Sequence, residues 1–280
     1  MKIVKKKKEL SELLLLEGSK TKGFVPTMGA LHSGHVSLLD LARKENDILI
    51  SSLFVNPTQF NNPRDLEIYP RPLEKDLEIL ESHSVDFAFV PDVPEIYEHA
   101  EPWHMDLGNL EKVLEGEKRP GHFQGVSQIV KILFDLVKPN RAYFGQKDYQ
   151  QYLVIQKLNE VFNLNIEIIA CPIIREPDGL AMSSRNLHLS HEERSIAPLI
   201  YKALNSIQLN SETMALKECL IKARSILESS PLFIVEYLEI VDKNDLNTLI
   251  QWTGSNNEIA LVAVRLGETR LIDNLIINRK

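Results

Sequence analysis

Cysteine is scarce in this chain, which has only Cys171 and Cys219 among its 280 residues. The two lie far apart in the sequence, without the close spacing that metal-binding cysteines have. The chain therefore offers no disulfide framework. Its cysteine usage fits a reducing compartment in which both thiols are buried and take no part in function.

Long apolar runs are missing as well, and no stretch approaches the roughly 20 apolar residues that span a bilayer. The start "MKIVKKKKELSELLLLEGSK" imitates a signal peptide, with four lysines followed by four leucines. Its apolar run is too short, lies between Glu12 and Glu17, and has no small-residue cleavage site. We interpret residues 5–17 as an amphipathic helix, and we expect a cytoplasmic protein that does not bind a membrane.

Positive charge is also limited, because the formal net charge is −7. Without a broad basic surface, non-specific binding of nucleic acid is excluded, and any anionic ligand must be held by a few local residues. The length is sufficient for one large or two modest domains. We find no internal repeat.

Short apolar segments alternate with helical patterns through the first two-thirds of the chain. The predicted strands cover residues 23–27, 47–55, 85–91, 141–145 and 165–174, and the predicted helices cover about 34–44, 72–83, 123–138 and 148–162. Strands that alternate with crossover helices predict a parallel sheet. Residues 1–177 are therefore expected to form a doubly wound, Rossmann-like α/β domain.

The pattern changes after the loop "REPDGLAMSSRNLHLS". Two helices are predicted at about 190–206 and 212–229, and three strand-like segments follow at 232–242, 259–267 and 269–277. Adjacent strands without crossover helices indicate a smaller α+β domain over residues 178–280.

The segment "FVPTMGALHSGHVSLLDLAR" places His32 and His35 at a predicted turn from strand to helix. Ligands of open α/β sheets bind beyond the carboxyl ends of the strands, and a helix N-terminus favours an anion there. Gly29 and Gly34 would let the backbone approach that anion. Both imidazoles could stabilise a phosphoryl group or move a proton. Histidines that only cap and pack remain an alternative, whereas a zinc site lacks nearby ligands.

Two further segments carry charged groups that suit a nucleotide. In "FGQKDYQQ", Lys147 could bind phosphate and Asp148 could accept from ribose hydroxyls, and Gln151 follows Lys147 by one helical turn. In "MSSRN", two hydroxyl groups and the Arg185 guanidinium could bind phosphates. Each segment is also consistent with an ordinary helix start.

Neutral amides and a few other polar side chains complete the candidates. In "NPTQF", Asn56 and Gln59 can donate and accept hydrogen bonds without fixing a charge, although turns often contain such residues. Arg119 and His122 either line the cleft or hold the helix that follows them. Asp76 is a weak candidate for a Mg²⁺ ligand, because a lone carboxylate on a helix is usually solvated.

The motif "PTMGALHSGH" resembles the nucleotide-binding signature of the superfamily that contains class I aminoacyl-tRNA synthetases and small nucleotidyltransferases. The longer resemblance, nearly end to end, is to the pantothenate synthetase (pantoate–β-alanine ligase) family. It rests on six further segments in order: "FVNPTQF", "YPR", "LEGEKRPGHFQGV", "YFGQKDYQQ", "AMSSRN" and "VRLGETRLIDN". Gln128 departs from the family pattern, which commonly has threonine there, and this leaves the packing of that helix open.

The resemblance implies roles for individual residues. His35 is the implied proton donor, and His32, Lys147 and Arg185 are the other implied catalytic groups. Gln59 and Gln151 are implied pantoate contacts, Gln59 next to the β-alanine site, and Asn56 supports them. The implied ATP contacts are Met28, Gly29, Ala30, Leu31, His32, Ser33, Gly34, His35, Gly145, Gln146, Lys147, Asp148, Ile174, Met182, Ser183, Ser184 and Arg185.

The implied reaction joins (R)-pantoate to β-alanine through a pantoyl-adenylate, with ATP as substrate and Mg²⁺ as its companion ion. The metal ligands stay unassigned. Closure of the second domain would protect the adenylate from water. The resemblance suggests a homodimer, for which residues 47–55 and the next helix could supply an interface. A nucleotidyltransferase and a binding protein without chemistry remain alternatives.

Overall fold

The computed structural model of the chain describes residues 1–98, 100–254 and 256–279. The chain divides into two compact units. The first consists of Met1–Gln146 and Gln150–Pro172, and the second of Lys147–Tyr149 and Ile173–Lys280. Within the described ranges, no helix has the length and hydropathy needed to cross a membrane.

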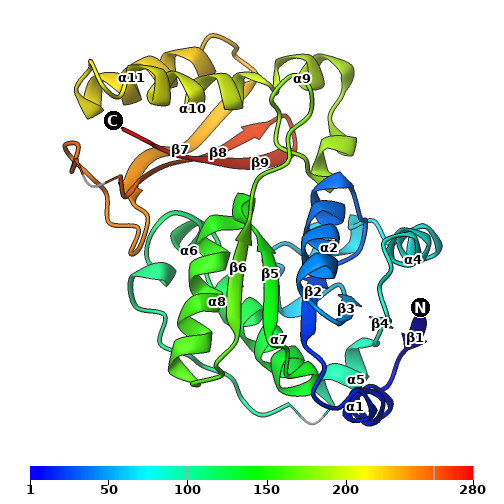
Figure 1. Cartoon of the computed structure of the whole chain (residues 1–280). Coiled ribbons are helices and arrows are strands. Elements are labelled where there is room, and N and C mark those ends of the chain that lie inside the picture. The colour runs from blue at the N-terminus through cyan, green and yellow to red at the C-terminus, as the bar shows by residue number, and fades with distance from the viewer. Residues whose placement is uncertain (99, 255, 280) are drawn as a thin grey trace. The chain divides into compact units, whose positions relative to one another are not determined.

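The first unit is built on a parallel sheet with the strand order β1-β4-β3-β2-β5-β6 (Figure 1). Its strands are β1 (Lys2–Val4), β2 (Lys22–Thr27), β3 (Ile48–Leu53), β4 (Phe87–Phe89), β5 (Arg141–Gly145) and β6 (Glu167–Cys171). Every neighbouring pair runs parallel. The predicted α/β fold is therefore confirmed. The edge strand β1 is too short to produce a periodic pattern, and the sequence did not predict it.

The long predicted helices are also confirmed. The helices up to residue 161 are α1 (Lys7–Leu16), α2 (Ser33–Glu45), α3 (Pro63–Ile68), α4 (Leu73–Ser82), α5 (Val93–Tyr97), α6 (Leu114–Lys118), α7 (His122–Val137) and α8 (Tyr149–Val161). Three short 3₁₀ helices accompany them: η1 (Pro57–Gln59), η2 (Gly108–Glu111) and η3 (Gln146–Asp148). The prediction missed α3, α5 and α6, which are too short to complete an apolar period. Helix α7 runs unbroken past the half-buried Gln128.

Helices cover both faces of the parallel sheet because the chain passes from β2 toward one edge and from β5 toward the other, and right-handed crossovers in opposite directions lie on opposite faces. On one face, leucines of α2 and α4 form a buried cluster with Leu49 and Tyr143. On the other face, Phe134 of α7 packs edge-on against Phe24 and Phe144. The first unit is therefore a three-layer structure that holds β2 and β5 at its centre.

Strand β3 shows why this core is continuous. All six of its residues are buried, as expected for a parallel strand with covered faces. It pairs with β2 on one side and β4 on the other. Its backbone and side chains are therefore used within the protomer, and the suggestion that residues 47–55 and the next helix supply a subunit interface stays a prediction.

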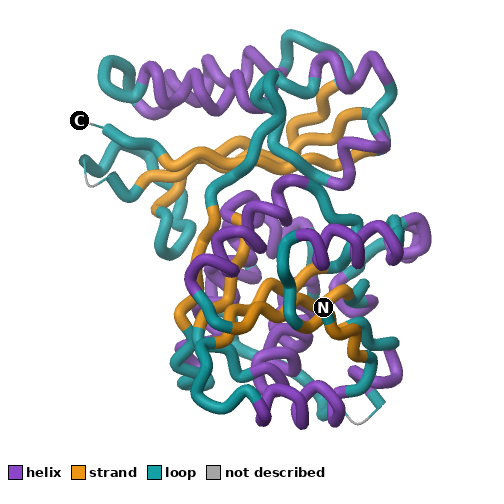
Figure 2. Tube along the Cα trace, turned by 45° about the vertical axis from the view of Figure 1, so that its right-hand side comes forward, coloured by secondary structure: helices purple, strands orange, loops and turns teal. Residues whose placement is uncertain are grey.

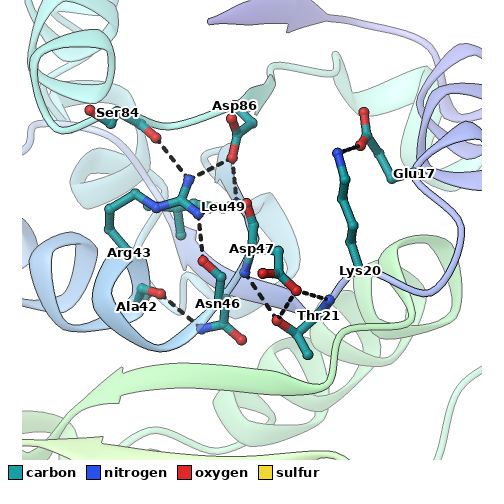
Figure 3. Close-up of polar contacts among 10 residues, drawn as sticks. All are labelled: Glu17, Lys20, Thr21, Ala42, Arg43, Asn46, Asp47, Leu49, Ser84 and Asp86. Carbon is teal, nitrogen blue, oxygen red and sulfur yellow. Dashed lines mark hydrogen bonds and ion pairs between the residues drawn. The ribbon is translucent and has the colours of Figure 1, made fainter.

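The amino-terminal edge of this sheet is joined by polar contacts (Figure 3). Arg43, near the end of α2, donates to the Asp86 carboxylate at 2.7 Å and to the backbone carbonyls of Asn46 and Asp47. Asp47 in turn accepts from the backbone and hydroxyl of Thr21, both at 2.8 Å. These contacts hold the starts of the strands in place. The turns that follow the strands lie at the opposite, carboxyl edge of the sheet.

The second unit combines an antiparallel sheet with helices on one face (Figures 1 and 2). Its elements are η4 (Ser184–His188), α9 (His191–Ile196), α10 (Leu199–Asn210), α11 (Leu216–Leu227), β7 (Phe233–Asp242), β8 (Glu258–Leu266) and β9 (Thr269–Ile276). Buried residues of α10 and α11, among them Leu204 and Leu227, pack against Val262 and Leu271 of the sheet. The α+β character predicted for this part is confirmed.

The single helix predicted over 190–206 is wrong. The chain forms α9 and α10 with a break at Ala197 and Pro198. Proline has no backbone N–H and its ring clashes with the carbonyl four residues earlier, so it ends one helix and begins the next.

Both cysteines are buried and free, as expected. Burial raises the pKa of the Cys171 thiol to about 12 and also raises the pKa of Cys219. Neither thiol forms a reactive thiolate at neutral pH.

Candidate functional site

The strand order places a topological switch point between β2 and β5. These strands are neighbours, and the chain leaves them toward opposite edges of the sheet. Ligands of open α/β sheets bind beyond the carboxyl ends of strands at such a point. Within the first unit, the turn after β2 and the residues Gly145 and Gln146 after β5 therefore lie at the expected edge.

The turn after β2 has a special backbone. Gly29 and Ala30 both have left-handed conformations, with φ values of 79° and 52°. The Gly29 N–H donates to the Thr27 hydroxyl at 3.2 Å, and that hydroxyl donates to the Ser52 carbonyl at 2.8 Å. The two left-handed residues turn successive N–H groups inward, which is the geometry of a small anion-binding nest.

Asp76 of α4 occupies that nest. Its two carboxylate oxygens accept from the N–H groups of Ala30 and Leu31, each at 2.8 Å. A Cβ atom on Gly29 would lie 2.8 Å from the same carboxylate, so glycine is needed for space as well as for its φ angle. The general expectation that a lone helix carboxylate is solvated does not hold for Asp76, because the residue is only 2% exposed.

This arrangement occupies the backbone N–H groups of Ala30 and Leu31, which were predicted to contact ATP. Both are buried, and their N–H groups already bind a carboxylate. The anion that the backbone of this turn approaches is therefore Asp76 of the same chain. The part of the turn that stays accessible begins at His32 and includes the exposed Ser33.

The two histidines form a reciprocal cap at the start of α2. His32 is the N-cap residue, and its Nδ1 accepts from the Gly34 N–H at 3.1 Å. His35 Nδ1 accepts from the His32 N–H at 3.3 Å, and the ring centroids lie 4.2 Å apart. Capping and chemistry are therefore compatible, because the cap uses only Nδ1 of each ring. Because each Nδ1 accepts a hydrogen bond, the proton of each neutral imidazole is assigned to Nε2, at the positively polarised start of α2.

Asn56, the N-cap residue of η1 shortly after β3, is buried, and both the Nδ2 and the Oδ1 of its side chain form hydrogen bonds. Its Nδ2 donates to Gln59 Oε1 at 3.0 Å and to the Gly125 carbonyl at 3.1 Å, and its Oδ1 accepts from the Tyr97 hydroxyl at 2.6 Å and the Thr58 hydroxyl at 3.0 Å. Burial raises the pKa of Tyr97, so its hydroxyl stays a donor at neutral pH. Asn56 therefore braces Gln59 in this structure, and its own amide is not open to a ligand.

Gln59 is held with a defined orientation. Its Oε1 is taken by Asn56, and its Nε2 lies 3.0 Å from Met28 Sδ, beside the histidine turn. The structure thus brings Gln59 next to Met28, which are a predicted pantoate contact and a predicted ATP contact. A sulfur atom is a weak acceptor, so the Nε2 group can exchange it for a carboxylate or hydroxyl oxygen.

Arg119 and His122 hold the Gln59 backbone. His122 Nδ1 lies 2.7 Å from the Gln59 carbonyl, Arg119 Nη2 donates to the same oxygen at 3.4 Å, and the two side chains contact each other at 3.1 Å. A Cβ atom on Gly125 of α7 would lie 2.5 Å from the Thr58 carbonyl. Of the two roles considered for Arg119 and His122, the structure supports fixing the segment around Gln59 against α7.

Gln151 and its neighbour Gln150 differ sharply. Gln150 is buried and binds the backbone of Leu110, Val113 and Glu115. Gln151, in the first turn of α8, is only partly buried. The predicted placement of Lys147 one turn earlier on the same helix is wrong, because α8 begins at Tyr149 and Lys147 lies in η3.

The remaining candidates belong to the second unit. Ser183 caps η4 by accepting from the Arg185 N–H at 3.2 Å. The Met182 N–H donates to the Ile174 carbonyl at 3.0 Å, so the two predicted nucleotide contacts are tied by their backbones. Ser184 follows at the start of η4, and Lys147 and Asp148 precede α8.

Two supporting residues escaped the sequence prediction or were given another role. Tyr97 had no signal, because its partner Asn56 lies 41 residues away. Asp76 stood out as the one aspartate in a helix otherwise bearing glutamates, but its partner turn is 45 and 46 residues away. Helical periodicity alone could have placed it on the buried face with Leu80.

Comparisons with known proteins agree over the whole chain. The family model described as Pantoate-beta-alanine ligase matches residues 2–276. The pantothenate synthetase of Aquifex aeolicus is 49% identical over 282 residues, with 97% of each chain covered. The crystal structure of pantothenate synthetase from Thermus thermophilus matches with a TM-score of 0.95 and 41% identity over 100% of both chains.

A further solved structure is that of pantoate-beta-alanine ligase from Francisella tularensis complexed with beta-gamma ATP and beta-alanine. It matches with a TM-score of 0.82 and 38% identity, covering 99% of this chain and 97% of that one. The identities and coverage are too high for a likeness of fold alone. The chain therefore belongs to the pantoate-beta-alanine ligase family and is a ligase that condenses pantoate with β-alanine.

Proposed function

We propose that this ligase works in two half-reactions. In the first, the pantoate carboxylate attacks the α-phosphorus of ATP, and pyrophosphate leaves. In the second, the β-alanine amine attacks the carbonyl of the pantoyl-adenylate, AMP leaves, and pantothenate is formed. The observation that carries this proposal is the pair of imidazoles that cap the start of α2 through their Nδ1 atoms, in the turn after β2 at the switch point of the sheet.

The first half-reaction needs positioned donors more than covalent help from the protein. Negative charge on the phosphoryl oxygens shifts during transfer, and preorganised donors stabilise it. His32 and His35 are the donors from the first unit. His35 would also give a proton to the departing group, since a neutral imidazole carries one on Nε2.

Pantoate is proposed to bind between two amides of the first unit, Gln59 and Gln151. Asn56 binds Gln59 Oε1, so the Gln59 Nε2 group beside Met28 is left to act as a donor, which suits a carboxylate or hydroxyl oxygen. A family member complexed with beta-gamma ATP and beta-alanine supports these two substrates for this chain. Gln59, beside Met28, would then also border the β-alanine site.

Groups of the second unit are proposed to complete the nucleotide site. Lys147 and Arg185 would bind phosphate oxygens, Asp148 would accept from the ribose, and the Ile174 backbone would meet the adenine. Ser183 and Ser184 would add hydroxyl donors. We further propose that residues 178–280 close over the site during the reaction and exclude water from the adenylate.

Mg²⁺ is proposed to accompany ATP. The described residues contain no group of three histidine, cysteine or acidic side chains that could hold a metal ion by themselves. Both Asp76 oxygens are engaged by backbone N–H groups. We therefore propose that Mg²⁺ is held mainly by the ATP phosphates and water, where it would neutralise charge on the triphosphate.

The wider setting is also part of the proposal. We expect a homodimer in the cytoplasm that binds its small substrates and neither nucleic acid nor a membrane. The net charge of −7 and the two free, buried thiols are consistent with this setting. Sedimentation of the purified chain would measure its oligomeric state.

An assay of AMP and pyrophosphate formation from ATP and pantoate, with and without β-alanine, tests the mechanism. With β-alanine, both products should form continuously. Without it, pyrophosphate release should stop after about one equivalent per site, because the adenylate stays bound. Continuous release without an amine would instead indicate a nucleotidyltransferase, and no release at all would indicate binding without chemistry.

The Gln151→Ala variant is expected to raise the KM for pantoate by about tenfold or more, because a hydrogen bond to a charged group contributes roughly 1.5–3 kcal/mol. The KM for ATP should stay near its original value. Gln156→Ala, at an exposed position of the same helix, serves as the control. An increase confined to the ATP constant would contradict the assignment.

A further inference from the structure

The segment "TRLIDN" near the C-terminus has no role in the mechanism so far. In the second unit it forms most of β9, the edge strand of the antiparallel sheet. Asp273 and Asn274 are 3% and 0% exposed. Two adjacent polar residues buried on an edge strand need partners, because an unpaired polar group in that position is costly.

Asp273 pairs with Arg175 through two hydrogen bonds. Arg175 Nη1 lies 2.6 Å from Oδ2, and Nη2 lies 3.0 Å from Oδ1. The same guanidinium donates to the Gly179 carbonyl at 3.1 Å and lies 4.1 Å from the centre of the Tyr201 ring. Arg175 also forms a backbone bridge with Ala181, so this ion pair fixes the turn that immediately precedes Met182–Arg185.

Asn274 extends the cluster to Lys147. Its Nδ2 donates to the Lys147 carbonyl at 3.0 Å, while its own carbonyl accepts from Arg175 Nη2 at 3.2 Å. A second contact holds the same short segment, since the Tyr149 hydroxyl donates to the Lys243 carbonyl at 3.0 Å. These contacts explain why residues 147–149 group with the second unit although the sequence on both sides belongs to the first.

We propose that Asn274 is a positioning residue for Lys147, and that the Arg175–Asp273 pair holds Asn274 and the turn before Met182 as one rigid group. Two elements proposed to bind ATP phosphates, η3 and the "MSSR" segment, would then move together. Asn274 touches the Lys147 backbone and acts through it, so it is not itself a catalytic residue. The inference rests on the function proposed above for Lys147.

The test is made on Asn274 because breaking the buried ion pair would leave a charge without its partner and endanger folding. Asn274→Ala is expected to lower kcat by about tenfold or more, since small misplacements of a binding group have effects of that order. The KM for β-alanine should not change. Asn278→Ala, an exposed asparagine just after β9, is the matched control. Asn274→Ser keeps the test available if the alanine variant does not fold.

A double-mutant cycle separates positioning from general damage. In a Lys147→Ala background, Asn274→Ala should cause a much smaller additional loss, because the side chain that Asn274 positions has been removed. An equal loss in both backgrounds, or none in the original enzyme, would overturn the inference.

Amide hydrogen exchange distinguishes failure of this inference from failure of the proposed function. Exchange in residues 147–149 should become faster in Asn274→Ala and stay unchanged in Asn278→Ala. Unchanged exchange together with lowered turnover would overturn the inference alone. If Lys147→Ala turned over as fast as the unmutated enzyme, the role proposed for Lys147 would be wrong, and so would the positioning role proposed for Asn274.

Discussion

Replacing His35 with alanine is expected to lower the turnover by about 10²–10⁴-fold, the usual scale for a lost acid–base or transition-state donor. His35 stands at the third residue of α2, with Nδ1 bound to the His32 N–H and its proton on Nε2. Alanine removes two functions, first the proton donor at Nε2 and second the helix cap at Nδ1. Steady-state release of AMP and pyrophosphate measures the first, and thermal unfolding followed by circular dichroism measures the second.

The stability part of this effect should be small. Loss of a helix cap lowers the free energy of unfolding by about 1 kcal/mol, so the alanine variant should remain folded at room temperature. His35→Asn separates the two functions, because its Oδ1 can accept from the His32 N–H in the place of Nδ1. It should recover stability and stay slow. His104→Ala, at an exposed position, should behave like the original enzyme. Near-normal turnover in His35→Ala would refute the role.

Asp76→Asn is expected to lower turnover by about 10²-fold and the free energy of unfolding by about 1–3 kcal/mol. Both carboxylate oxygens bind backbone N–H groups of the turn, and the asparagine amide would turn an N–H donor toward one of them. One buried N–H then loses its acceptor, and the turn that presents His32 must shift. Kinetics and thermal unfolding of the same preparation measure both effects.

The dependence of turnover on Mg²⁺ concentration distinguishes two roles for Asp76, holding the turn after β2 and binding a metal ion. If Asp76 holds the turn, excess Mg²⁺ will not restore turnover, and the protein without nucleotide will already be less stable. If Asp76 were a metal ligand, added Mg²⁺ would restore much of the activity and stability without nucleotide would be unaffected. Glu78→Gln, at an exposed position of the same helix, is the control. Gly29→Ala should reproduce the loss, because its Cβ would lie 2.8 Å from the Asp76 carboxylate.

Long elements with a clear period were predictable from the sequence, and short ones were not. The buried, mostly apolar run of β3 and the helical period that α7 keeps over sixteen residues are long enough to identify by themselves. Strand β1 has three residues and exists by pairing with β4, and helix α5 has five residues, so neither is long enough for a period. The break at Pro198 was readable in principle, because proline interrupts a helix by its own geometry.

The candidate site divides in the same way. His32 and His35 were predicted from a local motif, because a strand followed by a turn and a helix creates a known kind of ligand edge, whereas Gln59 was predicted from the family resemblance. The supports of these residues could not. Gln59 depends on Asn56 and Tyr97, and the contact between the Asn56 amide and the Tyr97 hydroxyl spans 41 residues. A local pattern carries no information about such a partner.

The sequence by itself determined the fold class, the family and the kinds of chemical group at each motif, since these depend on residue type, order and spacing. The tertiary structure decided what those groups contact. Asp76 meets the Ala30 and Leu31 N–H groups because α4 packs beside the turn after β2, and Asn274 meets Lys147 across 127 residues of sequence. Hydrogen bonds act over about 3 Å, so only the packing of distant segments determines which polar groups come within their reach.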